Sequence, residues 1–257
     1  MAFSFNKKKK KYNLGLALSG GGARGFAHPG AIKAIEDMGQ KPEVIVGTSA
    51  GALAGVLYAD GYTPEEIISL FVGTEFKEFA QIQIPKAGIF STQGFRRFLK
   101  KHLHAETFED LAIPVKVVTT NLDDGKSVVF HKGPLIEPVI ASCSIPIVFE
   151  PVVIDGINYV DGGIFKNFPV SVIRSDCEKV IGVNASPMVS RKYNKTIMQI
   201  AERSYHYMSR NNTLLDRKLC DILVEMEDLV TYKTFDIESA NKIFNIGYTY
   251  AKEALSK

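Results

Sequence analysis

The sequence around Ser49 limits the fold of this chain more than any other segment. The apolar run Val44–Val46 leads into the sequence GTSAG at 47–51, and small residues in a helical pattern follow. A G-x-S-x-G pattern in this setting is typical of a nucleophile elbow, a sharp strand-to-helix turn that exposes a serine hydroxyl. Such a turn has no room for a Cβ at Gly47 or Gly51, and it holds the serine in strained backbone geometry. The alternative is an ordinary strand that ends in a Gly/Ser turn, and the motif alone does not decide between the two.

Strand-like and helix-like segments alternate along most of the chain. Short β-branched runs predict strands, and longer amphipathic or small-residue runs predict helices. This alternation is typical of a layered α/β fold with a largely parallel central sheet. The expected strands are 14–19, 43–48, 114–121, 126–131, 151–154, 158–160, 179–184 and 221–227, and the expected helices are 26–38, 50–59, 64–71, 92–103, 135–142, 196–211 and 237–255.

The length and composition fit a globular protein with ample core. The chain has 257 residues, of which 46% are hydrophobic, and no internal repeat or long linker divides it. We expect a basic, disordered tail over residues 1–12 and a single domain over 13–257. No apolar run approaches the roughly 20 residues that a membrane-spanning helix needs.

The formal net charge of +3 comes from a lysine block near the N-terminus rather than from a basic face. This block consists of Lys7, Lys8, Lys9, Lys10 and Lys11, so the rest of the chain is net negative. A lysine block attracts anionic lipid headgroups by about 1 kcal/mol per Lys near the surface. Peripheral membrane contact and a solvated leader are the two interpretations. We expect no nucleic-acid binding, because no basic stripe with interleaved aromatic residues recurs in the body.

The N-terminal sequence and the cysteines both indicate a cytoplasmic protein. The apolar run at 14–18 is short and ends in a glycine-rich turn without the pattern of a cleavage site, so we expect no signal peptide. Cys143, Cys177 and Cys220 are odd in number and lack metal-ligand spacing, which favours reduced thiols. We expect no metal site.

A second glycine-rich turn follows the first expected strand. Residues 20–25 read GGGARG, which also matches the dinucleotide pattern G-x-G-x-x-G. A dinucleotide fold requires an Asp or Glu at the end of the next strand, but that strand ends here in the serine elbow. A Walker loop is excluded because Gly-Lys-Ser/Thr is missing. The turn instead suits an oxyanion, because backbone N–H groups of Gly20, Gly21 and Gly22 can converge at a helix N-terminus.

The glycine turn and the serine elbow are expected to lie close together. If the first two strands are adjacent and parallel, their carboxyl ends bring the turn close to Ser49. Arg24 then has three interpretations: a brace for the turn, a phosphate ligand, or an ordinary surface arginine.

Asp161 is the candidate base for the serine. It ends a short strand-like segment, and Gly162 and Gly163 follow it, so another backbone can approach closely. The alternative is an ordinary turn aspartate. His28 lies beside the glycine turn, where it packs or hydrogen-bonds, and His206 lies in the middle of an expected helix. No histidine occupies a loop after a late strand, where a triad in Ser…Asp…His order prefers it.

In their order along the chain, these three motifs resemble the patatin-like phospholipase family. The likeness runs from about residue 14 to 169, and the sequence CSIPIVFEP at 143–151 also looks like that family's segment before the aspartate. Relatives often have alanine at the position of Gly163, and both residues are small. The resemblance implies a small bacterial member with three α/β/α layers, in which a Ser49–Asp161 dyad, rather than a triad, hydrolyses fatty-acyl esters of lipids without metal or cofactor.

The expected site therefore has three parts. Ser49 is the nucleophile and Asp161 the proton acceptor, and the oxyanion hole is formed by Gly20, Gly21 and Gly22. The supporting residues are Arg24, Gly25, Gly47, Gly51, Gly162 and Gly163.

Several functional alternatives stay open at the level of sequence. A general carboxylesterase or thioesterase would use the same residues on another acyl donor, a triad through His206 is a mechanistic rival, and a lipid-binding or regulatory module would keep the fold without turnover. The apolar, interrupted segment 71–98 is either a mobile lid that touches a membrane or ordinary core. The sequence does not indicate the head group or the acyl chain.

Overall fold

The computed structural model describes most of the chain. The described residues are 9–72, 81–82, 90–187, 196–208, 210–234 and 236–257, and for 81, 82, 198, 199, 201, 202 and 206 only the backbone is described. Lys7 and Lys8 of the lysine block lie outside this range.

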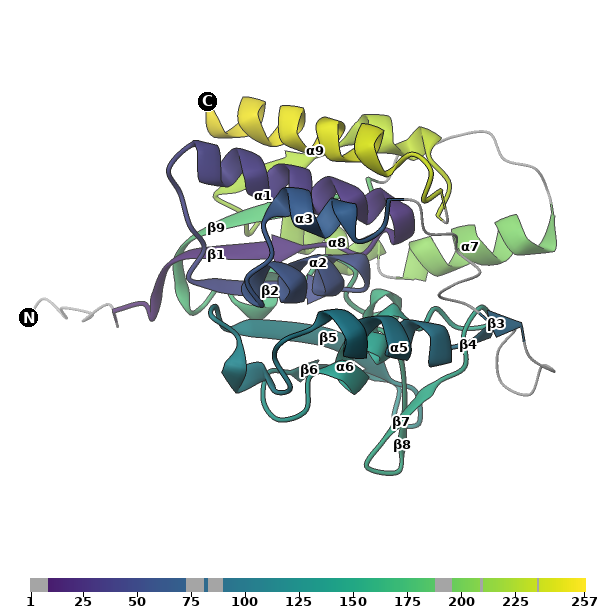
Figure 1. Ribbon diagram of the computed structural model, residues 1–257. Helices are drawn as coiled ribbons and strands as arrows, with labels where there is room; N and C mark the ends of the chain where they lie inside the picture. The colour runs from purple at the N-terminus through teal and green to yellow at the C-terminus, as the bar shows by residue number, and fades with distance from the viewer. Residues whose placement is uncertain (1–8, 73–80, 83–89, 188–195, 209, 235) are drawn as a thin grey trace, which may run out of the picture.

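A mostly parallel sheet of eight strands lies between layers of helices, as expected (Figure 1). The strand order is β10-β9-β1-β2-β5-β8-β7, with β6 also paired to β5. The first five strands in this order run parallel, and β6, β7 and β8 are joined by antiparallel pairing. The strands are β1 (Tyr12–Leu18), β2 (Val44–Thr48), β5 (Val115–Asn121), β6 (Lys126–Phe130), β7 (Val152–Ile154), β8 (Ile157–Asp161), β9 (Cys177–Asn184) and β10 (Ile222–Glu225), and a separate pair is formed by β3 (Gln81–Ile82) and β4 (Phe90–Ser91).

One face of the sheet is covered by α1, α2, α3, α5, α6 and α9, and the other by the turn η4 with α8. In Figure 1, α1, α3 and α9 lie together above the sheet, and α5 and α6 lie over its lower part. The helices are α1 (Ala27–Asp37), α2 (Ala50–Ala59), α3 (Pro64–Ser69), α5 (Gln93–His102), α6 (Ile136–Cys143), α7 (Ile197–Met208), α8 (Arg210–Arg217) and α9 (Ala240–Leu255), with short 3-10 turns η1 (Gly22–Phe26), η2 (Phe108–Asp110), η3 (Gly162–Ile164), η4 (Val170–Val172) and η5 (Glu227–Thr231).

The side chains of the central strands alternate between two apolar cores. Leu16 and Leu18 of β1 pack into the larger core, together with residues of α1, α2, α6 and α9. Ala17 of β1 and Val46 of β2 point to the opposite face, where they meet Phe168 and neighbours in and around η4. Strands that are buried on both faces read as continuous apolar runs, which explains why this part of the sequence predicts strands so clearly.

Most expected elements are confirmed, but two helices differ. The expected helix 196–211 corresponds to α7 and α8 on either side of residue 209, and helical structure continues to Arg217; Asp216 of α8 accepts the Ser171 N–H group of η4 (2.6 Å) and lies 3.3 Å from the Lys166 ammonium. The last helix begins at Ala240 rather than at 237. Asp236 accepts the N–H group of Ser239 (3.2 Å), so a side-chain turn occupies the residues just before the helix.

The described lysines of the N-terminal block lie at the end of the sheet where the parallel strands begin, and the serine elbow lies at the end where they finish. Lys10 donates to the Ser175 carbonyl (2.7 Å), and the Lys11 ammonium lies over the Tyr12 ring (4.9 Å). These residues precede β1, whereas Ser49 follows β2, and the two strands are parallel. Figure 1 accordingly shows the start of β1 on the side away from α7. Among the described residues, no helix is long and apolar enough to cross a membrane.

Candidate active site

Ser49 lies in a strained turn between β2 and α2. Its backbone has φ 53° and ψ −124°, a conformation that is rare for a residue with a side chain. A Cβ at Gly47 would come within 3.0 Å of Ala52, and one at Gly51 within 3.0 Å of the Leu18 carbonyl. The segment therefore has the geometry of a nucleophile elbow, and the two glycines are required by close backbone approach.

A buried serine supports the elbow from the side. The Ser49 N–H group donates to Ser142 Oγ (2.8 Å), and this hydroxyl donates to the Val118 carbonyl (2.7 Å). Ser142 is fully buried on α6. The chain of two hydrogen bonds ties the elbow to β5 and stabilises its unusual backbone.

The register of the sheet brings Asp161 to the serine. In β5, Val118 is paired with Thr48 of β2, and the next residue, Thr119, is paired with Asp161 of β8. The Asp161 carboxylate lies beside the Ser49 hydroxyl, which lowers its pKa, and it accepts a hydrogen bond from the Gly163 N–H group (2.8 Å). A Cβ at Gly162 would overlap with the Val118 carbonyl, so glycine is needed where β8 turns away from β5.

Burial makes Asp161 a stronger base than an ordinary aspartate. The side chain is only 1% exposed, and burial raises its pKa from 3.8 to about 6. Hydrogen bonds from Ser49, from the Gly163 N–H group and from Tyr205 oppose this rise because they favour the charged form. At neutral pH the group is therefore still a carboxylate, but it holds a proton more tightly than a solvated carboxylate does.

The glycine turn lies directly beside the serine. An ideal Cβ on Gly20 would lie 3.3 Å from Ser49 Cβ. The Gly20 N–H group donates to the Asn167 carbonyl (2.9 Å), and the Ala23 N–H group donates to the Thr234 carbonyl (2.7 Å). Gly22 has φ 59° and lines the same cavity as Ser49. Because Gly20 is already engaged, Gly21 and Gly22 are the candidate donors for an oxyanion.

Arg24 braces the glycine turn. Its side chain is 4% exposed, and Nε donates to the Gly21 carbonyl (3.3 Å) while one terminal nitrogen donates to Thr234 Oγ1 (3.5 Å). Of the three interpretations from sequence, the structure thus supports the brace. Gly25 lets η1 approach α2, since a Cβ there would overlap with Ala50.

His28 is a buried structural residue. Its Nε2 atom lies 2.7 Å from the Ser19 carbonyl, and burial lowers the pKa of its ring to about 4. The ring is therefore neutral at physiological pH and donates Nε2–H to that carbonyl, one residue before the glycine turn. His206 lies within α7, as the sequence indicates.

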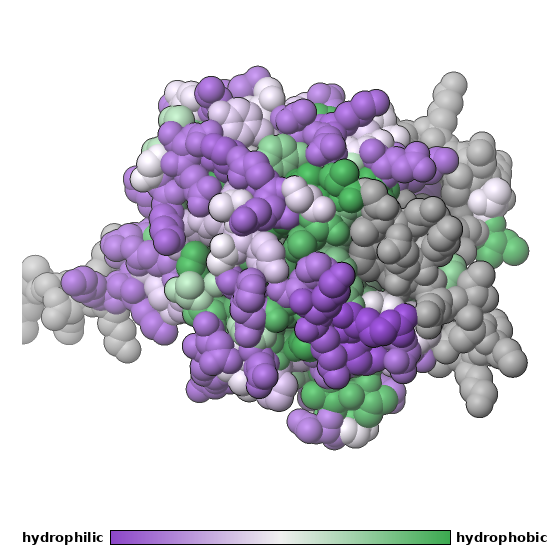
Figure 2. Space-filling view, in the orientation of Figure 1, coloured by the Kyte–Doolittle hydropathy of each residue, from purple (hydrophilic) through white to green (hydrophobic). Residues whose placement is uncertain are grey.

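An apolar slot begins at Ser49 and follows one face of α2. Ser49, Leu53 and Leu57 line it at helical spacing, so this wall is about 12 Å long at 1.5 Å per residue. Figure 2 shows apolar side chains in the area between α3 and α5, within a surface that is otherwise largely hydrophilic. The remaining apolar lining is contributed by Phe26, Pro29, Ala54, Ile67, Phe71, Phe95, Ile145, Phe149 and Ile237.

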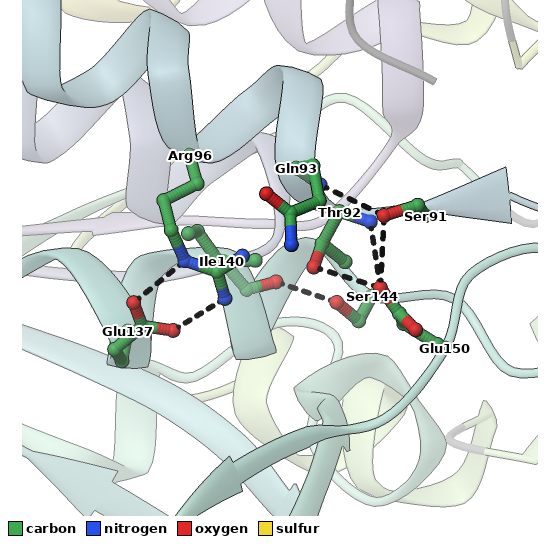
Figure 3. A network of polar contacts seen from close by, with 8 residues as sticks. All are labelled: Ser91, Thr92, Gln93, Arg96, Glu137, Ile140, Ser144 and Glu150. Carbon is green, nitrogen blue, oxygen red and sulfur yellow. Dashed lines mark hydrogen bonds and ion pairs between the residues drawn. The ribbon is translucent and has the colours of Figure 1, made fainter. Parts of the chain in front are cut away.

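A polar network holds one wall of this slot in place (Figure 3). Glu150 accepts hydrogen bonds from the Ser91 hydroxyl (3.1 Å) and from the Thr92 N–H group (3.1 Å) just before α5. Arg96 of α5 makes two hydrogen bonds of 2.8 Å to Glu137 of α6. These contacts fix α5, which carries Phe95, against α6 and the segment that carries Phe149.

The described parts of the segment 71–98 pack as core. Phe71 is 6% exposed, and its ring lies 5.3 Å from that of Phe26 and 5.1 Å from that of Phe98. Phe71 and Phe95 line the slot rather than point to solvent. The rest of the hypothetical lid, at 73–80 and 83–89, lies outside the described residues.

Sequence reasoning missed four residues at the site. Cys143 lines the slot beside Ser49, and burial raises the pKa of its thiol well above the usual value. Asn167 lies between the glycine turn and η3, and Ser142 and Tyr205 contact the elbow and the base, respectively. Cys143 was recognised only as part of a longer segment, and nothing in the local pattern marks Tyr205. In the described part of the chain, no three His, Cys, Asp or Glu side chains are grouped as metal ligands.

A family model matches the part of the chain that carries these motifs. The family model for patatin-like phospholipase matches residues 16–173, a range that includes both Ser49 and Asp161. The chain belongs to the patatin-like phospholipase family. This confirms the resemblance inferred from the three motifs.

Individual relatives agree with this assignment. An uncharacterized NTE family protein of Mycobacterium bovis is 33% identical over 183 residues, which cover 70% of this chain and 49% of the relative. The lysophospholipase nte1 of Emericella nidulans is 25% identical over 279 residues, with 95% of this chain and 18% of the relative covered. The chain thus spans half or less of these relatives. VipD from Legionella pneumophila shares the fold, with a TM-score of 0.57 and 17% identity over 96% of this chain and 67% of that protein.

Proposed function

We propose that this protein is a serine acyl hydrolase that cleaves fatty-acyl ester bonds of lipids with a Ser49–Asp161 dyad. The observation that carries the proposal is the placement of the Ser49 hydroxyl, in a strained elbow at the mouth of an apolar slot, beside the buried Asp161 carboxylate. Family membership supports the same reaction class.

In the proposed mechanism, Asp161 accepts the proton as Ser49 Oγ attacks the ester carbonyl. The N–H groups of Gly21 and Gly22 stabilise the oxyanion. Protonated Asp161 then gives its proton to the leaving alcohol, and an acyl-Ser49 ester remains. Asp161 finally takes a proton from the water that attacks this ester and returns it to Ser49 Oγ as the fatty acid leaves. A carboxylate is a weak base for an alcohol, and its raised pKa partly offsets this weakness.

The apolar lining of the slot favours a lipid substrate with a single acyl chain beside the serine. Its wall along α2 is apolar from Leu53 to Leu57, and nearby phenylalanines complete it. A lysophospholipid or phospholipid fits this chemistry, and the name of the Emericella nidulans relative favours a lysophospholipid. A general carboxylesterase or thioesterase would use the same residues, and a lipid-binding module would use the slot without turnover.

A hydrolysis panel tests the proposal. Phospholipid, lysophospholipid, monoacylglycerol and acyl-thioester are compared head to head for the unchanged protein and for Ser49→Ala, Asp161→Asn and His206→Ala. We expect release of fatty acid from a lipid ester, loss of it in the first two variants, and substantial activity in His206→Ala. Inactivity of His206→Ala would favour a triad, and no hydrolysis of any substrate would favour a binding module.

We also propose that residues 13–257 form one domain and that the lysine block makes peripheral contact with anionic membranes. Strands β9 and β10 lie in the same sheet as the motif-bearing strands, which supports a single domain. Since Lys10 and Lys11 lie at the edge opposite to Ser49, the block would act as a tether and would not aim the slot at the lipid. Co-sedimentation with anionic and neutral vesicles, before and after Lys→Ser changes in the block, tests the contact. Equal binding of both forms would support the solvated leader.

A further inference from the structure

A tyrosine hydroxyl occupies the space beside Gly163. An ideal Cβ built on Gly163 would come within 3.0 Å of the Tyr205 hydroxyl oxygen, and it would lie 3.1 Å from Asp161 Oδ1. The hydroxyl oxygen is buried, and Tyr205 belongs to α7, which packs against η3. The absence of a side chain at Gly163 thus lets a distant helix place a phenol next to the base.

The phenol interacts directly with the carboxylate. The Tyr205 hydroxyl oxygen and Asp161 Oδ1 both lie beside the same point above Gly163, and the phenol lowers the pKa of Asp161 against the effect of burial. Burial and the nearby carboxylate raise the pKa of Tyr205 well above its usual value, so the proton of the pair stays on the tyrosine. The carboxylate therefore accepts the Gly163 N–H group (2.8 Å) and lies beside the hydroxyls of Tyr205 and Ser49.

We propose that Tyr205 is a positioning residue for the base Asp161 and that Gly163 provides the space for its hydroxyl. The proposal rests on the proposed dyad. A hydrogen bond from Tyr205 favours the charged carboxylate, which is the form that accepts the proton of Ser49. The same bond fixes the orientation of the carboxylate, so that an oxygen stays directed at the nucleophile.

The arrangement also makes position 163 sensitive to size. Alanine and glycine are similar by volume, so the sequence alone suggests that either is acceptable. In this structure, however, the methyl group of alanine would collide with the Tyr205 hydroxyl, and the nearest atom of Asn167 would lie at 3.0 Å. The collision disappears when the hydroxyl oxygen is removed, so the two positions are predicted to be coupled.

The first test is the pH profile of kcat/KM for Tyr205→Phe. Loss of the hydrogen bond raises the pKa of Asp161, so the acid limb should move to higher pH by about one unit. At pH 8, where the carboxylate is charged in both proteins, loss of the orienting hydroxyl should still lower the activity about threefold. Each profile is normalised to its own maximum, so partial loss of folded protein does not move the limb.

Tyr207→Phe is the matched control. Tyr207 lies on the same helix and is 51% exposed, and its hydroxyl accepts a hydrogen bond from Arg203 (2.6 Å). Its removal should leave the acid limb in place. An acid limb that Tyr205→Phe does not move, or that Tyr207→Phe moves equally, would overturn the proposal.

The second test is a double-mutant cycle between the two positions. Gly163→Ala should reduce kcat/KM at pH 8 at least tenfold, and Gly163→Ala combined with Tyr205→Phe should recover most of this loss. A combined variant as impaired as Gly163→Ala alone, or a Gly163→Ala variant with full activity, would contradict the packing argument.

Asp161→Asn separates this proposal from the proposed dyad. If Asp161→Asn is inactive while Tyr205→Phe keeps an unshifted profile, only the positioning role of Tyr205 fails. If Asp161→Asn keeps full activity, the dyad itself is wrong.

Discussion

Replacing Asp161 by asparagine should abolish activity and at the same time stabilise the fold. Burial raises the pKa of Asp161 from 3.8 to about 6, so the folded state binds the proton more tightly than the unfolded state does. Keeping the group charged in the fold above pH 6 therefore costs about 3 kcal/mol, at 1.36 kcal/mol for each pKa unit. Asparagine carries no charge and still accepts the Gly163 N–H group, so this cost disappears.

The difference in unfolding free energy between the two proteins should become smaller as the pH falls. As the pH falls from 6 towards 3.8, the folded protein takes up the proton first and the cost fades. Asp161→Asn should therefore exceed the unchanged protein in unfolding free energy by up to about 3 kcal/mol at pH 8 and by about half as much at pH 5. At pH 8 this corresponds to a rise in Tm of about 6–12 °C for a chain of this size.

Urea unfolding at pH 8 and pH 5, with equal m values, measures this difference, and ester hydrolysis should fall at least 100-fold at both. Asp155→Asn, in the exposed turn between β7 and β8, is the control and should change the unfolding free energy by less than about 0.5 kcal/mol. A loss of stability in Asp161→Asn, or a gain that does not depend on pH, would refute the reasoning about its burial.

Three further predictions follow from the same site. The acid limb of kcat/KM should have its midpoint near pH 6, so activity at pH 5 should be about a tenth of the plateau; a midpoint near 4 would contradict a buried base. Ser49→Gly and Ser49→Ala should both be inactive, but the glycine variant should be more stable by about 1 kcal/mol because φ 53° strains alanine. Thermal unfolding of the two variants measures this difference, and equal stability would mean that the turn stores no strain. Ala54→Phe should shorten the slot about 7.5 Å along α2 from Ser49 and change the ratio of butyryl to palmitoyl ester hydrolysis at least tenfold; an equal fall on both esters would place the acyl chain elsewhere.

The fold and the elbow were predictable because their signals are local. Parallel strands that are buried on both faces, such as Val44–Thr48, leave apolar β-branched runs, and the elbow needs glycine at two positions set by backbone contact. Asp161 was predictable as a motif, but its distance from Ser49 depends on the pairing of β8 with β5, which no local pattern indicates.

The rest of the site is assembled from distant parts of the chain. Tyr205 reaches Asp161 from α7, and Asn167 accepts the Gly20 N–H group from the segment after η3. Neither residue stands in a distinctive sequence motif. Each reaches the site only through tertiary packing. The same holds for α8, which extends beyond the expected helix and contacts η4 through Asp216.

Labelling by a fluorophosphonate probe tests the central claim most directly, because it reports the nucleophile without assuming a substrate. The account predicts a single adduct on Ser49, mapped by mass spectrometry, that is absent from Ser49→Ala and forms at least 100-fold more slowly in Asp161→Asn at pH 8. An adduct on another residue, or an Asp161→Asn protein that reacts as fast as the unchanged one, would contradict a serine activated by this aspartate.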